Sequence, residues 1–361
     1  MKQWPRPRGP HLSRSLPNLR VFRGRAFSSG KPFLESNSHD PRIRDLGRRI
    51  LDDYATIRET YATPKHPIVL AHGLLGFSEL KLAPLLPAIE YWHGIKQALV
   101  ANNCAVLATS VPPSGSIEER AEKLAADILA QMRAASASAS QHDAGKPSSS
   151  TSSDGGGGGL EGKDGQAPVV NIIAHSMGGL DARYMISRLR PRGIKVASLV
   201  TIATPHRGSP FADYLVESGA GPLHLPRLYG VIRRAGLGTS AFGQLTTRYM
   251  RDEFNPRVPD EGSVRYFSYG AMIDEPSLLG AFRVPHGVVW RAEGENDGLV
   301  SVESSRWGAY KGTLVGVSHL DLINWSNRAG WAVREWMGMR RNFNAVAFYL
   351  DVADMLAKEG L

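Results

Sequence analysis

The chain of 361 residues contains one cysteine, Cys104. A single thiol excludes an intrachain disulfide, so the fold is stabilised by its apolar core. The absence of a disulfide suits a reducing compartment such as the cytosol or the mitochondrial matrix. Cys104 lies in the apolar stretch NNCAVLATSV, where we expect a small buried side chain rather than a reactive thiol. No stretch approaches the ~18 uninterrupted apolar residues of a membrane-spanning helix, whereas binding to a membrane surface stays open.

Acidic residues are absent from residues 1–31, which carry eight basic ones. The net charge of the chain is +9, so these eight charges leave +1 for the remainder, and a nearly neutral remainder argues against a nucleic-acid partner. An Arg- and Ser-rich segment without the apolar core of a secretory signal predicts a mitochondrial transit peptide over 1–31. The alternative is a basic tail, because four prolines would interrupt an amphipathic helix.

Large apolar side chains are almost absent from residues 134–168, which are mostly Ala, Ser, Gly and polar residues. Such a composition cannot bury enough apolar area to order itself, so we expect a disordered insertion. The segment is not a domain boundary, because apolar residues resume directly at 169–176 and a longer loop costs little closure entropy. We therefore expect one domain over 32–361.

Helical and strand patterns alternate along that domain. This alternation predicts an α/β fold with a mostly parallel sheet that is covered on both faces. The expected strands cover 66–73, 105–111, 169–176, 196–203, 264–270 and 287–294, and the expected helices cover 44–61, 91–100, 116–132, 178–189, 320–337 and 342–358.

A turn with a serine follows the strand at 169–176 and precedes a helix, in the stretch VVNIIAHSMGGLDARYMI. Strand, tight turn and helix are the context in which a serine serves as a nucleophile, with its hydroxyl at a helix N-terminus that favours negative charge. Ala174 stands at the first position of this motif, where Gly is usual. We predict Ser176 as the nucleophile, and its alternative role is that of a helix cap.

Acyl transfer also requires two backbone N–H donors for the oxyanion. Met177, the residue after the serine, would supply the first donor. Leu74, which follows His72 and Gly73 at the end of the strand at 66–71, is the candidate for the second.

A serine nucleophile requires a histidine base and a carboxylate, which follow it in the order Ser, acid, His in an α/β-hydrolase sheet. His206 comes too early to be preceded by an acid loop, so we predict His319 as the base. Asp297, in the Gly-flanked turn GENDGLVS, is the predicted acid, with Glu293 and Glu295 as alternatives.

Several motifs follow one another in chain order: AHGLLG (71–76), YWHGIKQAL (91–99), SIEERAEKLAADI (116–128), VNIIAHSMGGLDARYMI (170–186), VTIATPHRGSPFADYL (200–215), NDGLVSVESSRWG (296–308) and SHLDLIN (318–324). Together they resemble the family I triacylglycerol lipases of the Pseudomonas and Burkholderia type and their fungal mitochondrial relatives. The resemblance implies the α/β-hydrolase fold, with Ser176, Asp297 and His319 as the triad and Leu74 and Met177 as oxyanion donors.

The resemblance further implies a structural calcium ion held by two aspartates and two backbone carbonyls, since calcium takes oxygen ligands. Asp321 and Asp274 match these aspartates, and Asp321 has the alternative role of a helix cap. It also implies a helical lid within 209–250, where arginines that could meet lipid headgroups are interspersed among apolar residues. The alternative is ordinary packing of two amphipathic helices.

The function implied by this resemblance is hydrolysis of acylglycerol esters at a lipid–water interface, with no organic cofactor. Alternatives are a phospholipase or an acyltransferase with the same triad, or a lipid-docking protein without catalysis. The leader predicts a mitochondrial location in the matrix or at the inner membrane, and the alternatives are the cytoplasm and the lipid-droplet surface.

Overall fold

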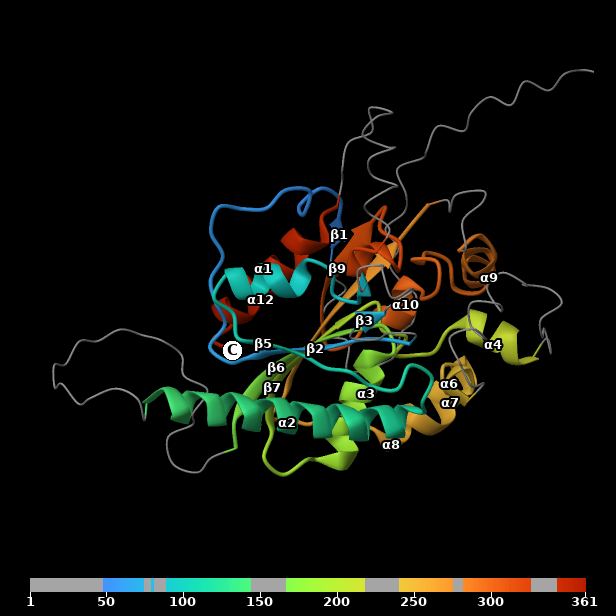
Figure 1. The fold of residues 1–361 in the computed structure, drawn as a ribbon. Coiled ribbons are helices and arrows are strands. Elements are labelled where there is room, and N and C mark those ends of the chain that lie inside the picture. The colour runs from blue at the N-terminus through green and yellow to red at the C-terminus, as the bar shows by residue number, and fades with distance from the viewer. Residues whose placement is uncertain are drawn as a thin grey trace, which may run out of the picture. The chain divides into compact units, whose positions relative to one another are not determined.

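Seven strands form one sheet in which every pairing is parallel (Figure 1). The computed structural model describes residues 48–74, 79–80, 89–143, 167–217, 240–274, 282–325 and 343–361. The strand order is β1-β9-β8-β7-β6-β2-β5. The strands are β1 (Arg49–Ile50), β2 (Ile68–Ala71), β5 (Val106–Ala108), β6 (Val169–His175), β7 (Lys195–Ile202), β8 (Arg265–Met272) and β9 (Ala309–Val315).

Helices cover both faces of this sheet, which confirms the predicted α/β fold (Figure 1). One face carries α1 (Ile95–Ala101) and α12 (Ala345–Lys358), which contact each other. The other carries α2 (Ile117–Asp143), α3 (Gly178–Tyr184) and the π-helix η1 (Met185–Leu189). Strands β3 (Glu79–Leu80) and β4 (Ile89–Glu90) form a separate antiparallel pair.

Two apolar cores lie against the two faces of the sheet, because successive side chains of a strand point in opposite directions. In β2, Ile68 and Leu70 join the core that contains α1 and α12. Val69 and Ala71 of the same strand join the core that contains α2 and α3. A strand buried on both sides needs apolar residues at every position, which explains its uninterrupted apolar sequence.

The remaining helices lie in the segments that follow β7, β8 and β9. Figure 1 shows α4, α6, α7 and α9 together on one side of the molecule. These segments are α4 (Pro210–Glu217), α6 (Ser240–Gln244), α7 (Thr247–Tyr249), the π-helix η2 (Met250–Phe254), α8 (Asn255–Arg257), α9 (Arg283–Glu293), α10 (Val302–Ser305) and the 3-10 helix η3 (Asp321–Ile323).

One predicted strand is wrong, because residues 287–294 belong to α9 and its C-terminus. The β-branched and aromatic residues of GVVWRAEG favoured a strand. Burial follows a helical period instead, since Pro285, His286 and Val289 are buried while Val284 and Trp290 are exposed. The strand that follows β8 in the chain and pairs with it is β9, which we did not predict.

The predicted helix over 44–61 is also wrong for the residues that the structure describes. Residues 49–50 form β1, and no helix occurs over 48–61. Arg49 and Ile50 pair in parallel with Thr313 and Leu314 of β9, and Ile50 is buried. Pairing with residues distant in sequence thus outweighs the local preference of this segment for a helix.

The predicted insertion overlaps a helix, because α2 continues to Asp143 and residues 134–143 are therefore helical. Adding alanine-rich turns to an existing helix avoids the cost of nucleation. The rest of the insertion up to residue 166, the leader over 1–31, residues 218–239 of the predicted lid and residues 326–342 lie outside the described residues.

No helix in the described part of the chain is long and apolar enough to cross a membrane.

Candidate active site

Ser176 stands in the turn between β6 and α3, with a backbone φ of 55°. This left-handed conformation is uncommon for a residue with a side chain and has to be held by its surroundings. The Ser176 amide donates to the carbonyl of Ile202, and its carbonyl accepts from the Gly179 amide and from the Thr204 hydroxyl, at 2.9, 3.1 and 2.8 Å. These bonds fix the hydroxyl at the carboxyl edge of the sheet.

The two glycines after the serine allow this tight packing. A Cβ atom on Gly178 would lie 2.6 Å from the carbonyl oxygen of Ala71. A Cβ atom on Gly179 would lie 2.2 Å from the Thr204 hydroxyl oxygen, the group that bonds to Ser176. Both distances are shorter than van der Waals contact, so glycine is needed where α3 approaches β2 and the chain after β7.

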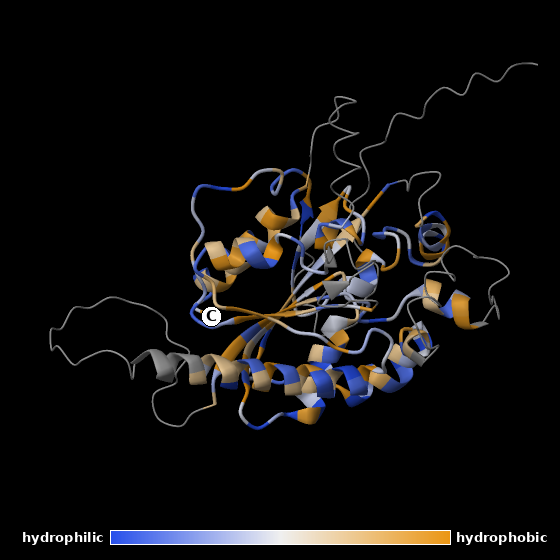
Figure 2. Ribbon diagram, in the orientation of Figure 1, coloured by the Kyte–Doolittle hydropathy of each residue, from blue (hydrophilic) through white to orange (hydrophobic). Residues whose placement is uncertain are grey.

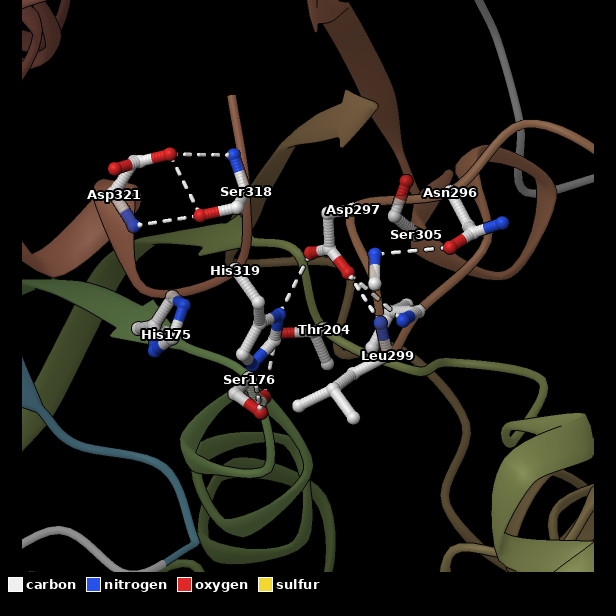
Figure 3. A network of polar contacts seen from close by, with 12 residues as sticks. His175, Ser176, Thr204, Asn296, Asp297, Leu299, Ser305, Ser318, His319 and Asp321 are labelled. Atoms are coloured by element: carbon white, nitrogen blue, oxygen red, sulfur yellow. Dashed lines mark hydrogen bonds and ion pairs between the residues drawn. The ribbon is translucent and has the colours of Figure 1, made fainter. Parts of the chain in front are cut away.

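His319 links the serine to a carboxylate (Figure 3). Its Nε2 lies 3.0 Å from the Ser176 hydroxyl oxygen, and its Nδ1 lies 2.6 Å from the Asp297 carboxylate. With a neutral imidazole, Nδ1 donates to Asp297 and Nε2 accepts from Ser176. The predicted residues Ser176, Asp297 and His319 are thus brought together in a line of hydrogen bonds.

Asp297 is fully buried but well supplied with donors. Its second carboxylate oxygen accepts from the amides of Leu299 and Val300, at 3.0 and 2.9 Å. Its carbonyl accepts from the His319 amide at 2.9 Å. The loop after α9 and the loop after β9 are therefore attached to each other through both the main chain and the side chains.

The two alternative acids point elsewhere. Glu293 accepts a hydrogen bond from the Ser301 hydroxyl, and Glu295 pairs with Arg49. Asp297 is therefore the carboxylate that contacts His319.

His206 lies in a separate buried network, as its early position indicated. Its Nδ1 accepts from the Arg183 guanidinium at 3.3 Å, and its Nε2 donates to the Thr201 hydroxyl at 2.9 Å. The ring stacks on Trp307 at 4.7 Å, and the Arg183 guanidinium lies 3.7 Å from the centre of the same ring. Sequence reasoning missed this network, because its members are scattered along the chain.

The candidate oxyanion donors flank the serine. Within the described residues, the amides of Met177 and Leu74 donate no hydrogen bond. Leu74 follows Gly73, and a Cβ atom on Gly73 would lie only 2.7 Å from the Ser176 Cβ atom. The backbone that carries Leu74 therefore passes directly beside the nucleophile.

Tyr91 and His175, which we did not predict as site residues, form a buried layer behind the triad. The Tyr91 hydroxyl donates to His175 Nδ1 at 2.7 Å and accepts from the Gly73 amide at 3.1 Å. The His175 and His319 rings lie 4.6 Å apart. Burial lowers the pKa of His175 well below its ordinary value, and a charge on His319 acts in the same direction. His175 is thus neutral beside the base.

A buried ion pair lies beneath the nucleophile turn. Arg120 of α2 donates to Asp181 of α3 at 3.0 Å and to the carbonyl of His72 at 2.9 Å. Burial raises the pKa of Asp181 to about 6, and the positive charge of Arg120 opposes this shift. The pair ties both helices to the end of β2, just before Gly73 and Leu74.

The two aspartates predicted to hold calcium have different surroundings. Asp321 accepts from the amide and the hydroxyl of Ser318, at 2.9 and 2.6 Å, and is the first residue of η3, whose N-cap is Leu320, so it is not the cap of this helix. Asp274 is exposed after β8. The described residues contain no group of three or more His, Cys, Asp or Glu side chains that could hold a metal ion. Carboxylate and carbonyl oxygens are the ligand atoms that calcium prefers, so the chemistry of the two predicted aspartates and two backbone carbonyls fits the ion.

Comparison with known proteins identifies the family. Residues 158–217, which include the nucleophile turn, match the PGAP1-like alpha/beta domain. The chain is 34% identical to triacylglycerol lipase 2 of Saccharomyces cerevisiae, across 86% of this chain and 97% of that relative. The chain belongs to the triacylglycerol lipase family. The resemblance found in its motifs is thereby confirmed, and the protein is a hydrolase of the lipase type.

More distant relatives agree with this family. A triacylglycerol lipase of Pseudomonas fragi is 25% identical across 82% of this chain and 98% of the relative. Among solved structures, the Staphylococcus hyicus lipase matches with a TM-score of 0.53 at 18% identity, covering 84% of this chain and 98% of that one. The structural match shows that the lipase fold is shared.

Proposed function

We propose that this chain hydrolyses carboxylic esters of acylglycerols through an acyl-enzyme at Ser176. The observation that carries the proposal is the line of hydrogen bonds from Ser176 through His319 to Asp297. It stands at the carboxyl edge of a parallel sheet, where α/β folds place their ligands. The family to which the chain belongs supports an acylglycerol as the substrate.

In the acylation step, the Ser176 hydroxyl oxygen attacks the ester carbonyl while its proton passes to Nε2 of His319. The amides of Met177 and Leu74 stabilise the oxyanion that forms. When the tetrahedral intermediate collapses, the ester bond breaks and the leaving alcohol takes the proton from His319. The acyl group is then bonded to Ser176.

In the deacylation step, water replaces the alcohol. His319 removes a proton from water, which attacks the acyl-enzyme, and the proton returns to the Ser176 oxygen as the fatty acid leaves. Asp297 holds the tautomer of His319 that accepts at Nε2 and stabilises the imidazolium in both steps. The neutral His175 adds no second positive charge beside that imidazolium.

The test is hydrolysis of emulsified triacylglycerols of short and long chain, with a matched phospholipid as a second substrate. Ser176→Ala should abolish the release of fatty acid, because no acyl-enzyme can form. Ser187→Ala is the matched control, since Ser187 is buried in η1, which follows α3. Preference for phospholipid would favour a phospholipase. Transfer of the acyl group to an added alcohol in place of hydrolysis would favour an acyltransferase, and turnover of neither lipid by the folded protein would favour a docking protein.

A mitochondrial location is part of the proposal and is supported by the composition of residues 1–31. Residues 1–40 fused to a fluorescent protein should direct it to mitochondria. Replacing the six arginines of residues 1–31 with glutamine should leave the fusion protein in the cytoplasm. Mitochondrial import of the glutamine variant would contradict the proposal.

A structural calcium ion is likewise proposed, with Asp274 and Asp321 as its side-chain ligands. When bound, the ion would neutralise these carboxylates and fix the chain that follows His319. Calcium should raise the melting temperature of the parent protein by a few degrees relative to a chelator, and Asp274→Asn should remove this increment. An equal melting temperature with and without calcium would contradict the proposal.

A further inference from the structure

Helix α9 exposes an apolar stripe at the side of the molecule that also carries α4 (Figure 1). Val284 is 42% exposed and Trp290 is 46% exposed. Pro285, His286 and Val289 on the opposite side of the same helix are buried. Residues six apart lie about 120° apart around a helix, so Val284 and Trp290 mark the two edges of its exposed side. Large apolar side chains that remain in water on one side of a helix indicate a binding surface.

Two cations border this stripe. Arg283 and Arg291 are exposed, and each is adjacent in sequence to one of the exposed apolar residues. Positions 283, 284, 290 and 291 fall on one side of a helix, because seven residues make nearly two turns. Figure 2 shows hydrophobic and hydrophilic segments side by side on α9.

The tryptophan ring is held in place. Trp290 stacks on the buried His286 ring, with the centroids 5.6 Å apart and the planes at 22°. An exposed aromatic ring that is already oriented loses little conformational freedom when it is buried at an interface. The neighbouring helix α4, which contacts α9, also exposes an apolar side chain, Val216, at 52%.

Helix α9 is also attached to the loop that carries the catalytic acid. The Asn296 side chain donates to the carbonyls of Gly294 and His286, at 2.9 and 3.4 Å. Its oxygen accepts from the Gly298 amide at 2.9 Å, as the dashed line from Asn296 in Figure 3 shows, so Asn296 links α9 to the residue that follows Asp297. Because α9 leads directly into the loop that carries Asp297, a lipid or protein surface bound to α9 would lie against the element that precedes the triad acid.

We propose that α9 is the anchor by which this protein binds an anionic phospholipid surface. Trp290 and Val284 would enter the boundary between headgroups and acyl chains, where tryptophan is enriched. Arg291, which is adjacent to Trp290, would extend to the phosphate groups, as arginines beside an apolar surface do. The inference rests on the proposed function, because it supplies the contact through which an acylglycerol hydrolase would reach substrate held in a lipid phase.

Vesicle binding of the full chain tests this anchor. We expect vesicles that contain phosphatidylglycerol to bind about tenfold more tightly than vesicles of phosphatidylcholine alone. Trp290→Ala should weaken binding to the anionic vesicles about tenfold, and Arg291→Gln should weaken it about fivefold at low salt. Val100→Ser is the matched control, because Val100 is 52% exposed on α1, which covers a face of the sheet away from α9. The basic segment 1–31 is common to all these proteins, so differences between them report on α9.

A second measurement shows whether the ring itself enters the bilayer. In vesicles with brominated acyl chains, quenching of tryptophan fluorescence should be smaller for Trp290→Phe than for the parent, although phenylalanine preserves most of the binding. Equal binding of Trp290→Ala and the parent, an equal loss in Val100→Ser, or equal quenching of Trp290→Phe would overturn the proposal.

Hydrolysis of a water-soluble short-chain ester separates the two proposals. We expect Trp290→Ala, Arg291→Gln and Val100→Ser to hydrolyse it at rates within twofold of the parent. If the parent itself does not hydrolyse the ester, the proposed function fails while the vesicle measurements still test the anchor. If hydrolysis is normal and binding does not depend on α9, the anchor fails and the proposed function stands.

Discussion

Two buried histidines near the carboxyl ends of the strands have opposite surroundings. His319 lies between a carboxylate and a hydroxyl, whereas His206 lies between a guanidinium and a hydroxyl and stacks on Trp307. Both rings are almost inaccessible to water. A carboxylate at Nδ1 accepts the N–H of the ring and leaves Nε2 as an acceptor, while a guanidinium at Nδ1 donates and leaves the N–H on Nε2. The partner at Nδ1 therefore distinguishes a proton acceptor from a structural ring.

Replacing each histidine with alanine should give the largest contrast. His319→Ala should lower kcat about 10⁵-fold, because the serine loses the group that takes its proton. His206→Ala should leave kcat within about threefold of the parent and lower the unfolding free energy by about 3 kcal/mol, since it opens a cavity beside Trp307. Ester hydrolysis and urea unfolding measure the two effects, and a loss of kcat of similar size in both variants would refute the contrast.

Asp297→Asn tests the partner at Nδ1 directly. An amide that donates to Nδ1 would impose the opposite tautomer and direct an N–H toward Ser176, so kcat should fall about 10⁴-fold. The amide oxygen can still accept from Leu299 and Val300, so the melting temperature should change little. Kinetics and thermal unfolding of the same preparation check both statements. A fall of less than tenfold would show that the carboxylate is unimportant.

Arg183→Met removes the cation from the other histidine. The guanidinium donates to Asn255 and to the Val258 carbonyl as well as to His206, so its loss leaves several buried acceptors unsatisfied. We expect a loss of about 3 kcal/mol in unfolding free energy, measured in urea, with kcat of the folded fraction nearly unchanged. Unchanged stability would mean that the network contributes little to the fold.

The pH dependence of the unfolding free energy should report on Asp354, a carboxylate that contacts neither of these histidines. Burial alone would raise the pKa of Asp354, but hydrogen bonds from Lys358, the Ala62 amide and Arg58 lower it to about 2, from an ordinary value of 3.8. A lowered pKa in the folded state stabilises the protein above pH 3.8, and this contribution is lost as the pH falls toward 2.

Asp354→Asn should therefore lower the unfolding free energy by about 1 kcal/mol at pH 6 and by less below pH 3. Thermal unfolding across this range measures the difference. If Asp354→Asn lowered the unfolding free energy equally at all pH values, the lowered pKa of Asp354 would be contradicted.

The parts of the molecule that the sequence predicts well are those in which local pattern and tertiary structure agree. The turn around Ser176 shows this, because an apolar strand, small residues and a helix follow one another without interruption. Asp297 and His319 could be chosen because their order and their loops match the needs of a serine nucleophile. Asp297 also lies in a turn whose main chain closes on its own carboxylate.

The errors arise where distant contacts decide. Residues 283–293 contain valines and tryptophan that favour a strand, but the segment is helical, and its buried positions 285, 286 and 289 have the spacing of one helix face. The short strand β1 depends on pairing with β9, more than 250 residues away, which no local pattern reveals. The Arg183 network was missed for the same reason, since its members meet only in the folded chain.

The placement of the chain between α2 and β6 has a consequence for how this protein can vary. That chain leaves the end of α2 at Asp143 and enters β6 at Val169, at the start of the strand, whereas Ser176 follows the end of the same strand. Length can therefore be added or removed there without displacing the reacting groups. The position is a natural place to insert an affinity tag or a reporter domain in recombinant protein.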